Sequence, residues 1–153
     1  MATPRSQNGK ATWLPNGIDS VPLDGNRSVI NQASSVLTAA DSGKTFSVSL
    51  AGTTTYTLPP TAPGLVYTMA YVGNDFGNAN NPGAGVASTL QFAPNAADGI
   101  SGAGAATVIN KALILAAATI RKGDYVTIAS LAGTAGVTAW HVIAQHGILT
   151  KQP

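Results

Sequence analysis

The sequence contains no cysteine and no glutamate, and it has few charged residues of any kind. The absence of cysteine excludes disulfide bonds and thiolate metal ligands. Charged residues make up only 9% of the 153 residues, against roughly 25% in an average globular chain. Hydrophobic residues make up 44%, so the low charge does not indicate disorder. A surface with so few charges resists association poorly, and we expect partners or other copies of the chain to cover much of it.

Long apolar runs and clusters of basic residues are also missing. The longest apolar stretch, residues 112–120, is far too short to span a bilayer. The N-terminal segment lacks the apolar run that a secretory signal peptide needs. The basic residues are spread along the chain, only Arg121 and Lys122 are adjacent, and the net charge is +2. We therefore expect neither a membrane nor a nucleic acid among the partners.

From Val36 onward, apolar and polar residues alternate with the period of a half-buried β-strand. Leu113 and Leu115 would share one face of such a strand, although the alanines around them favour helix. Strands are predicted at residues 45–50, 53–58, 65–72, 89–92, 112–120, 124–131 and 137–145. Turns rich in glycine, proline and asparagine separate them. This pattern predicts an all-β fold, a single antiparallel sandwich or barrel of the jelly-roll kind.

Residues 1–33 have a different character from the remainder. Prolines at positions 4, 15 and 22 interrupt any helix or strand ladder, and apolar residues occur singly. We expect an extended N-terminal arm, residues 1–33, followed by a β-sandwich or barrel domain, residues 34–153. Two placements are open for the arm, along its own domain or along a neighbouring molecule, and we favour the second. The candidate contact residues are Trp13, Leu14, Ile18, Val21, Leu23 and Ile30.

The triplet Gly43-Lys44-Thr45 has the ending of a nucleotide-binding P-loop. A P-loop also needs a glycine at position 38 and a helix after the threonine, whereas this chain has Thr38 and a strand pattern. We interpret the segment as a turn in which Thr38 caps, Asp41 lies near exposed N–H groups and Gly43 takes a left-handed conformation. The glycines of residues 102–104 lack the strand–glycine–helix unit of a dinucleotide site and are interpreted as a loop.

Histidine and aspartate give no local catalytic or metal-binding pattern. His141 and His146 are an odd number of residues apart, which predicts opposite faces of one strand and no shared metal site. No serine lies in a nucleophile elbow, and no aspartates form a local carboxylate pair of the glycosidase type. The aspartates are Asp19, Asp24, Asp41, Asp75, Asp98 and Asp124. We predict a protein without enzymatic activity, cofactor or metal.

Aromatic side chains could form a platform for a sugar. The candidates are Trp13, Trp140, Tyr56, Tyr67, Tyr71 and Tyr125. Most of them lie within predicted strands, where packing in the core is the usual role. Carbohydrate binding therefore stays open as an alternative rather than as the leading interpretation.

Two segments resemble a module of tailed-bacteriophage virion proteins. VLTAADSGKTFSVSLAGTTTYTLPPTAPGLVYTMAYVG, starting at Val36, has in order a Leu-Thr, an Asp-Ser-Gly-Lys turn, a strand, a Thr-Leu-Pro strand end and a strand opened by glycine. GDYVTIASLAGTAGVTAWHVIAQHG, starting at Gly123, resembles the end of the same module. The module fills most of the chain, and no repetitive shaft or coiled coil accompanies it. The chain is thus most similar to capsid decoration (cement) proteins.

That resemblance implies a structural virion protein on the outer surface of the phage head. It implies copies, often homotrimers, that bridge neighbouring subunits of the major capsid protein and stabilise the capsid. The alternative is a receptor- or glycan-binding module of a phage tail or head fibre, which would expose aromatic residues around the polar loop of residues 74–85.

Overall fold

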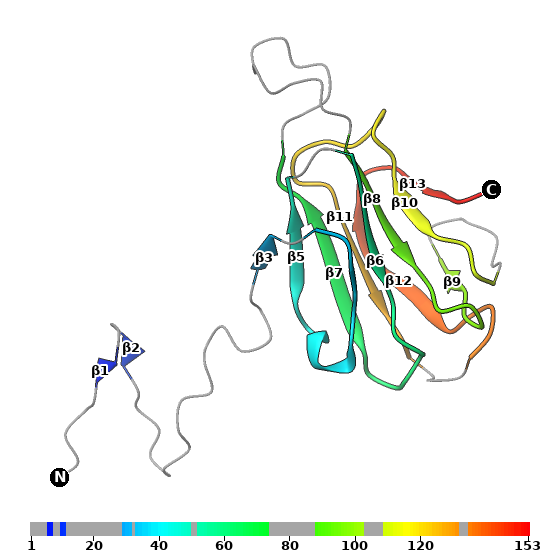
Figure 1. Ribbon diagram of the computed structural model, residues 1–153, viewed down its shortest axis with the longest axis horizontal. Helices are drawn as coiled ribbons and strands as arrows, with labels where there is room; N and C mark the ends of the chain where they lie inside the picture. Colours follow the sequence, from blue (N-terminus) through cyan, green and yellow to red (C-terminus); the bar gives the residue numbers. More distant parts are fainter. Residues whose placement is uncertain are drawn as a thin grey trace.

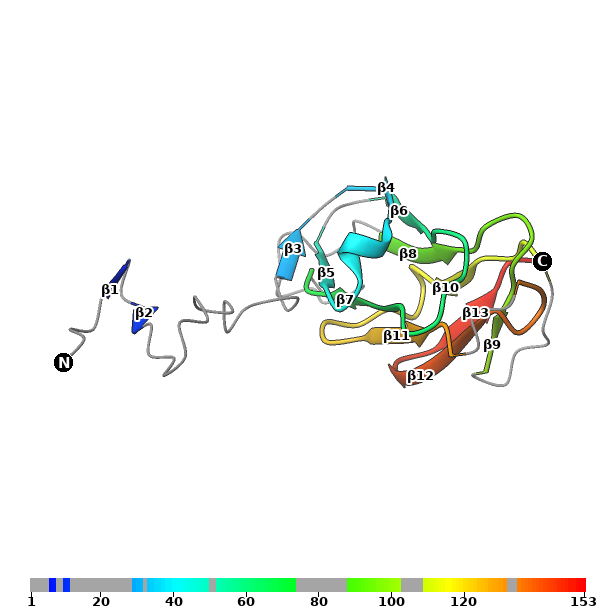
Figure 2. The same cartoon turned by 90° about the horizontal axis from the view of Figure 1, so that it is seen from below.

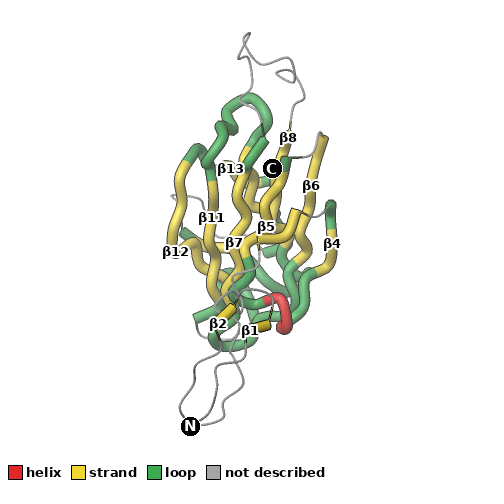
Figure 3. The backbone as a smooth tube through the Cα atoms, turned by 90° about the vertical axis from the view of Figure 1, so that its left-hand side faces the viewer, coloured by secondary structure: helices red, strands yellow, loops and turns green. Residues whose placement is uncertain are grey.

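The protein folds as a β-sandwich in which two sheets pack face to face (Figures 1 and 2). The computed structural model describes residues 6–7, 10–11, 29–31, 33–49, 52–73, 88–102, 109–131 and 135–153. Within these residues the only helical segment is a single 3-10 turn, η1 (Ala39–Asp41), drawn in red in Figure 3. The all-β sandwich that the alternating sequence predicts is confirmed.

The two sheets differ in size. The first has six strands in the order β3–β5–β7–β11–β12–β9, with bounds β3 (Val29–Asn31), β5 (Thr45–Val48), β7 (Val66–Tyr71), β11 (Tyr125–Ala129), β12 (Trp140–His146) and β9 (Ile100–Ser101). The second has five in the order β13–β10–β8–β6–β4, with bounds β13 (Leu149–Lys151), β10 (Leu113–Leu115), β8 (Ser88–Ala93), β6 (Gly52–Thr57) and β4 (Ser35–Val36). A separate pair consists of β1 (Ser6–Gln7) and β2 (Lys10–Ala11).

From β5 to β8, each successive strand crosses to the other sheet and reverses direction. Strands two apart in sequence therefore lie in one sheet and run parallel, as β5 does with β7 and β6 with β8. Later strands pair antiparallel, β10 with β8 and β13, and β11 with β7 and β12. The sheets are consequently mixed, whereas the sequence led us to expect antiparallel pairing throughout.

The strand predictions agree with the structure where the alternating pattern is long. The segments predicted at 45–50, 53–58, 65–72, 89–92, 124–131 and 137–145 correspond to β5, β6, β7, β8, β11 and β12. The prediction for 112–120 holds only for β10, because residues 117–119 form a turn. The short strands β3, β4, β9 and β13 were not predicted, since two or three residues give no recognisable period.

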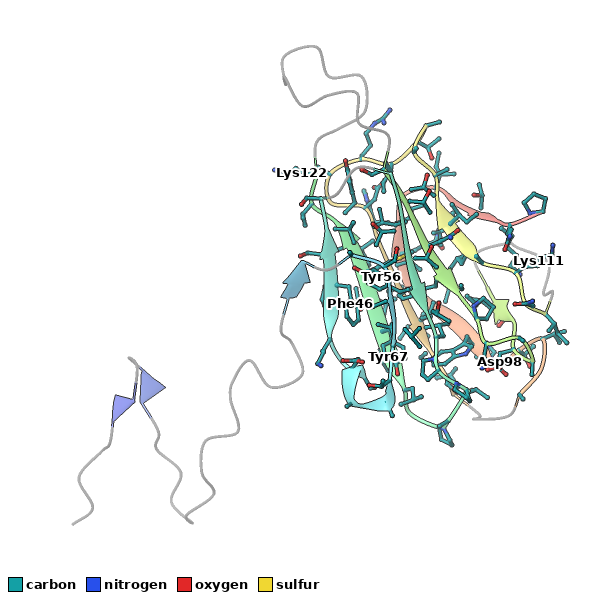
Figure 4. The ribbon with its side chains drawn as sticks, viewed as in Figure 1. Phe46, Tyr56, Tyr67, Asp98, Lys111 and Lys122 are labelled. Atoms are coloured by element: carbon teal, nitrogen blue, oxygen red, sulfur yellow. The ribbon has the colours of Figure 1, made fainter. Side chains whose placement is uncertain are left out.

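The inward positions of both sheets meet in one hydrophobic core. Phe46 of β5 lies against Tyr56 of β6, with ring centroids 4.8 Å apart, so aromatic rings join the sheets (Figure 4). Tyr67 packs on Trp140 with centroids 5.7 Å apart, and both side chains are fully buried. Leu113 and Leu115 are buried on one face of β10, as predicted. Aromatic burial of this kind dominates the energetics of a core.

The segment that resembles a P-loop ending is a turn followed by a strand, as interpreted. The Asp41 carboxylate accepts hydrogen bonds from the backbone N–H and the hydroxyl of Thr38, at 2.9 and 2.7 Å. Lys44 Nζ donates to the same carboxylate at 2.7 Å. The hydrogen bonds from Lys44 and Thr38 lower the pKa of Asp41. Gly43 has a φ of 83°, the left-handed exit expected of glycine. The Lys44 ammonium is thus engaged within its own turn.

Tyr67 ties the η1 turn to the core. Its hydroxyl donates to the Thr38 carbonyl at 2.8 Å, and the side chain lies beside the turn in Figure 4. Burial, with a smaller effect of the Asp41 charge, raises the pKa of Tyr67 to about 12. The hydroxyl therefore stays protonated and keeps donating throughout the neutral range. Both ends of the turn are thus held to β7, at Thr38 by the Tyr67 hydroxyl and at Gly43 by its N–H, which donates to the Val66 carbonyl at 2.7 Å.

Candidate interaction surface

The polar clusters of the sandwich are engaged in holding strands and turns together. Asp124, which precedes β11, is buried, and its carboxylate accepts the Arg121 backbone N–H at 2.7 Å. The other carboxylate oxygen is 3.0 Å from Nδ1 of His146, at the end of β12. The His146 ring, which is 70% exposed, stacks on Tyr125. The cluster joins the ends of β11 and β12 on the surface of the molecule.

Gly147 makes room for this cluster, and we predict a large effect of adding one methyl group there. A Cβ on Gly147 would lie 2.6 Å from Cγ of Asp124, and φ is +99°. Gly147→Ala should therefore lower the free energy of unfolding by about 2–4 kcal/mol, from backbone strain and the displaced carboxylate. Chemical denaturation measures the change.

Gly123→Ala is the matched control for that substitution. Gly123 has a similar φ of +94°, but nothing lies within 4 Å of a Cβ there. Gly123→Ala should lower the free energy of unfolding only by the backbone strain, about 1 kcal/mol. Equal losses for the two variants would show that the close approach of Asp124 does not matter.

His141 bonds to a serine, in an arrangement that suits structure better than catalysis. Ser101 Oγ lies 2.7 Å from His141 Nδ1 and 3.0 Å from the Trp140 carbonyl. Ser101 has only one hydroxyl proton. Both contacts are hydrogen bonds only if His141 Nδ1–H donates to Ser101 Oγ and the hydroxyl donates to the Trp140 carbonyl. In that tautomer the imidazole is not a base toward the serine. The pair fastens β9 to β12, which it joins in parallel.

The prediction that the two histidines point to opposite faces is wrong, because β12 contains a β-bulge. Val142 pairs with Ile128 and Ala144 pairs with Thr127, which leaves Ile143 without a partner on β11. The extra residue shifts the alternation. His141 and His146 face Ala129 and Tyr125, which are an even number of residues apart on β11, so both histidines lie on the outer face. Each has its own polar partner near one end of the strand.

The buried aspartates lie at opposite ends of β12. Asp98 is near the start, where its carboxylate accepts the Thr61 backbone N–H at 3.1 Å, and Asp124 is near the end. They do not form a carboxylate pair. Within the described ranges, no three His, Cys, Asp or Glu side chains gather to hold a metal ion. Asp19, Asp24 and Asp75 lie outside the described residues.

Most of the aromatic side chains considered for a sugar platform are buried in the core. Tyr56, Tyr67, Tyr71 and Trp140 have 0–2% of their surface exposed. Tyr125 is half-buried beneath His146. Trp13 and the loop of residues 74–85 lie outside the described residues. The buried rings cannot stack on a sugar without unfolding the sandwich.

Within the described strands, the outer faces of both sheets carry no lysine, arginine or aspartate, and the two histidines of β12 lie on the outer face of the six-stranded sheet. The six-stranded sheet presents Val66, Thr68, Ala70, Tyr125 and Thr127 from β7 and β11. The five-stranded sheet presents Thr53, Thr55, Thr57, Thr89, Gln91, Ala93, Ile114 and Thr150. Several of these side chains bond to one another, as Thr68 does to Thr127 at 2.9 Å and Gln91 to Thr55 at 2.6 Å. Some of the polar groups on these faces thus have hydrogen-bond partners within the same face.

Large apolar side chains are exposed elsewhere on the described surface, most of them in loops and turns. The list is Val36, Val72, Ile109, Leu131, Val137, Ile143 and Ile148, with exposed fractions of 43–72%. Val36 is the most exposed, at 72%, on the short edge strand β4. Apolar residues scattered singly are normal on a protein surface. Their combination with sheet faces that carry no lysine, arginine or aspartate in the described strands gives this molecule a surface suited to contact with protein.

The predicted arm residues are placed only in part. Trp13, Leu14, Ile18, Val21 and Leu23 lie outside the described residues. Ile30 belongs to β3, where its backbone pairs with Phe46 of β5. Residues near the end of the predicted arm thus form an edge strand of the six-stranded sheet. The sequence did not predict this strand, because three residues are too few to show an alternating pattern.

Comparison with known proteins gives no further guide: no protein-family model, curated protein or solved structure matches this chain. No helix in the described part of the chain is long and apolar enough to cross a membrane.

Proposed function

We propose that this chain is a capsid decoration protein, which coats the outer surface of a phage head and stabilises it. The observation that carries the proposal is the outer face of each sheet, which has no lysine, arginine or aspartate in the described strands, together with the large apolar side chains exposed elsewhere on the surface. A protein that worked alone in solution would gain solubility from charge on such faces. Threonine and alanine in their place suit surfaces that are covered on assembly.

The partners in this proposal are the major capsid protein and further copies of the chain, in the homotrimer that the sequence resemblance implies. The mechanism is mechanical rather than chemical. The sandwich supplies a rigid body, and the polar clusters at the ends of β12 hold its strands together. The arm, residues 1–28, would lie in clefts between capsid subunits through Trp13, Leu14 and Ile18. Contacts that span two subunits oppose their separation under the pressure of packaged DNA.

Purified chain and undecorated phage heads test the proposal directly. The chain should co-sediment with heads in a fixed ratio to the major capsid protein. Coated heads should also retain their DNA to a higher temperature than uncoated heads, because ligand binding stabilises the bound state. A chain that stays in the supernatant at saturating concentration, and leaves the temperature of DNA release unchanged, would contradict it.

A further inference from the structure

One side of β12 is an open strand edge. Of its seven residues, β9 pairs only with Trp140 and His141. No other described strand pairs with the outer side of residues 142–146, which we term the β12 edge, and Gly102, just after β9, lies beside the backbone of Val142 only. Figure 3 shows β12 beyond β11 at the side of the six-stranded sheet. The side chains of its last four residues are exposed, and Ile143 is 51% exposed.

The backbone of Gln145 points to this open side. Hydrogen bonding alternates along each strand of a sheet. On β7, Thr68 N–H bonds toward β5 at Lys44, and Tyr71 N–H bonds toward β11 at Asp124. Met69 therefore bonds toward β11, where it pairs with Val126.

Since the backbone groups of Val126 are used by β7, they are not available to its partner on β12. That partner is Gln145. The N–H and C=O of Gln145 consequently face away from β11, toward the open side. An outward donor and acceptor on one residue is the arrangement by which a strand edge adds another strand.

The other edges of the sandwich carry protections that the β12 edge lacks. β13 has Lys151 at an inward register position opposite Leu113, and burial lowers the pKa of this lysine. Inward-pointing lysines and very short strands are common means of blocking edge-to-edge pairing. β4 and β9 are only two residues long, and β3, the opposite edge of the six-stranded sheet, has three. The β12 edge, Val-Ile-Ala-Gln-His, contains neither a lysine nor a proline.

We propose that the β12 edge pairs with the same edge of a second copy of this chain, antiparallel, across a twofold axis at Gln145. Each Gln145 N–H donates to the Gln145 carbonyl of the other copy. The pairing starts beyond the bulge at Ile143, so Ala144 of one copy faces His146 of the other. The two six-stranded sheets join into one continuous sheet.

The choice of a second copy as the occupant comes from the chemistry of the strand. Self-pairing of a charged strand places like charges close together, which destabilises a sheet. The residues around this axis carry no permanent charge, and a small side chain, Ala144, lies opposite the imidazole. The edge is thus complementary to itself. This twofold contact is separate from the threefold contact of a trimer, and it does not depend on the capsid proposal.

Gln145→Pro tests the pairing. Proline removes the N–H that points outward, which an edge strand tolerates, and leaves the bonds to β11 intact. In sedimentation equilibrium, the dimer fraction of the wild-type chain should rise with concentration. Gln145→Pro should raise the dimer dissociation constant at least tenfold. Gln145→Ala, the matched control, keeps the outward N–H and loses only an exposed side chain, and it should leave the association as in wild type. Association unchanged by Gln145→Pro, or a wild type that remains a single chain, overturns the proposal.

A crosslink provides a second test if the proline variant does not fold. The chain has no cysteine, so Gln145→Cys introduces a single thiol. Opposed residues of a hydrogen-bonded antiparallel pair have Cα atoms about 5.5 Å apart, within the range of a disulfide. Mild oxidation should convert most of this variant into covalent pairs, but only a small fraction of Thr150→Cys. Equal crosslinking of the two variants would reject a specific axis at Gln145. The coating assay on phage heads is read separately, so failure here leaves the capsid proposal standing.

Discussion

A chain that lacks residues 1–28 is expected to fold as a sandwich and to leave phage heads uncoated. The truncation keeps β3, which pairs with β5 and belongs to the sheet. It removes Trp13, Leu14 and Ile18, each of which would contribute about 1.5–3 kcal/mol when buried in a cleft. Because about 1.4 kcal/mol is a factor of ten in affinity, coating should weaken by at least about a thousandfold. Co-sedimentation with undecorated heads measures this loss.

A full-length pair of variants separates the arm's side chains from its length. A variant with serine at Trp13, Leu14 and Ile18 should lose coating to the same extent as the truncated chain. A variant with alanine at the polar neighbours Asn16 and Ser20 should coat heads as well as the native chain. Melting temperatures of the sandwich should agree among all of these proteins. Coating that survives loss of the three apolar side chains would assign the capsid contact to the sandwich instead of the arm.

Trp140→Ala should cause the largest loss of stability of any single substitution in the sandwich. Trp140 is fully buried, packs on Tyr67 and begins the strand that carries both histidine clusters. Removing a buried tryptophan side chain costs about 3–5 kcal/mol, through lost burial and the cavity that remains. Since a domain is stable by only about 5–15 kcal/mol, we expect partial unfolding at room temperature. Denaturant titration followed by circular dichroism measures it.

Trp140→Phe and Val36→Ala calibrate that result. The indole N–H of Trp140 is buried and makes no hydrogen bond within the described part of the chain, so phenylalanine loses volume but no polar contact and should cost clearly less than alanine. Val36 is 72% exposed, and its truncation should change stability by less than about 0.5 kcal/mol. A loss at Val36 as large as that at Trp140 would contradict the assignment of the core.

The sequence predicts the strands of this fold better than their partners. Alternation in TFSV and VYTMAY identifies β5 and β7 and the inward positions of Phe46 and Met69, because period two is a local property. The parallel pairing of these two strands depends on β6 crossing to the other sheet between them. That crossing is set by packing of one sheet on the other, which no local pattern records. The expectation of antiparallel sheets differs from the structure for this reason.

The sequence predicts polar contacts where the partners lie within a few residues of one another. The turn from Thr38 to Gly43 was predicted with its cap, acid and left-handed glycine, since these features depend on bonds between residues three apart, whereas its long-range bonds to Val66 and Tyr67 were not foreseen. The placement of His141 and His146 was not, because a bulge inserts Ile143 between them and reverses the alternation. Their partners Ser101 and Asp124 come from other strands and turns. Contacts of that kind follow from topology rather than from spacing.

Electron cryo-microscopy of phage particles that contain this chain tests the central claim most directly. If these sheet faces and the apolar arm cover a capsid, density that fits the sandwich should repeat over the outer surface of the head. An extended segment of density should then run from β3 into the junctions between capsid subunits. Density for the sandwich on a tail fibre or baseplate, with a bare head, would contradict the account.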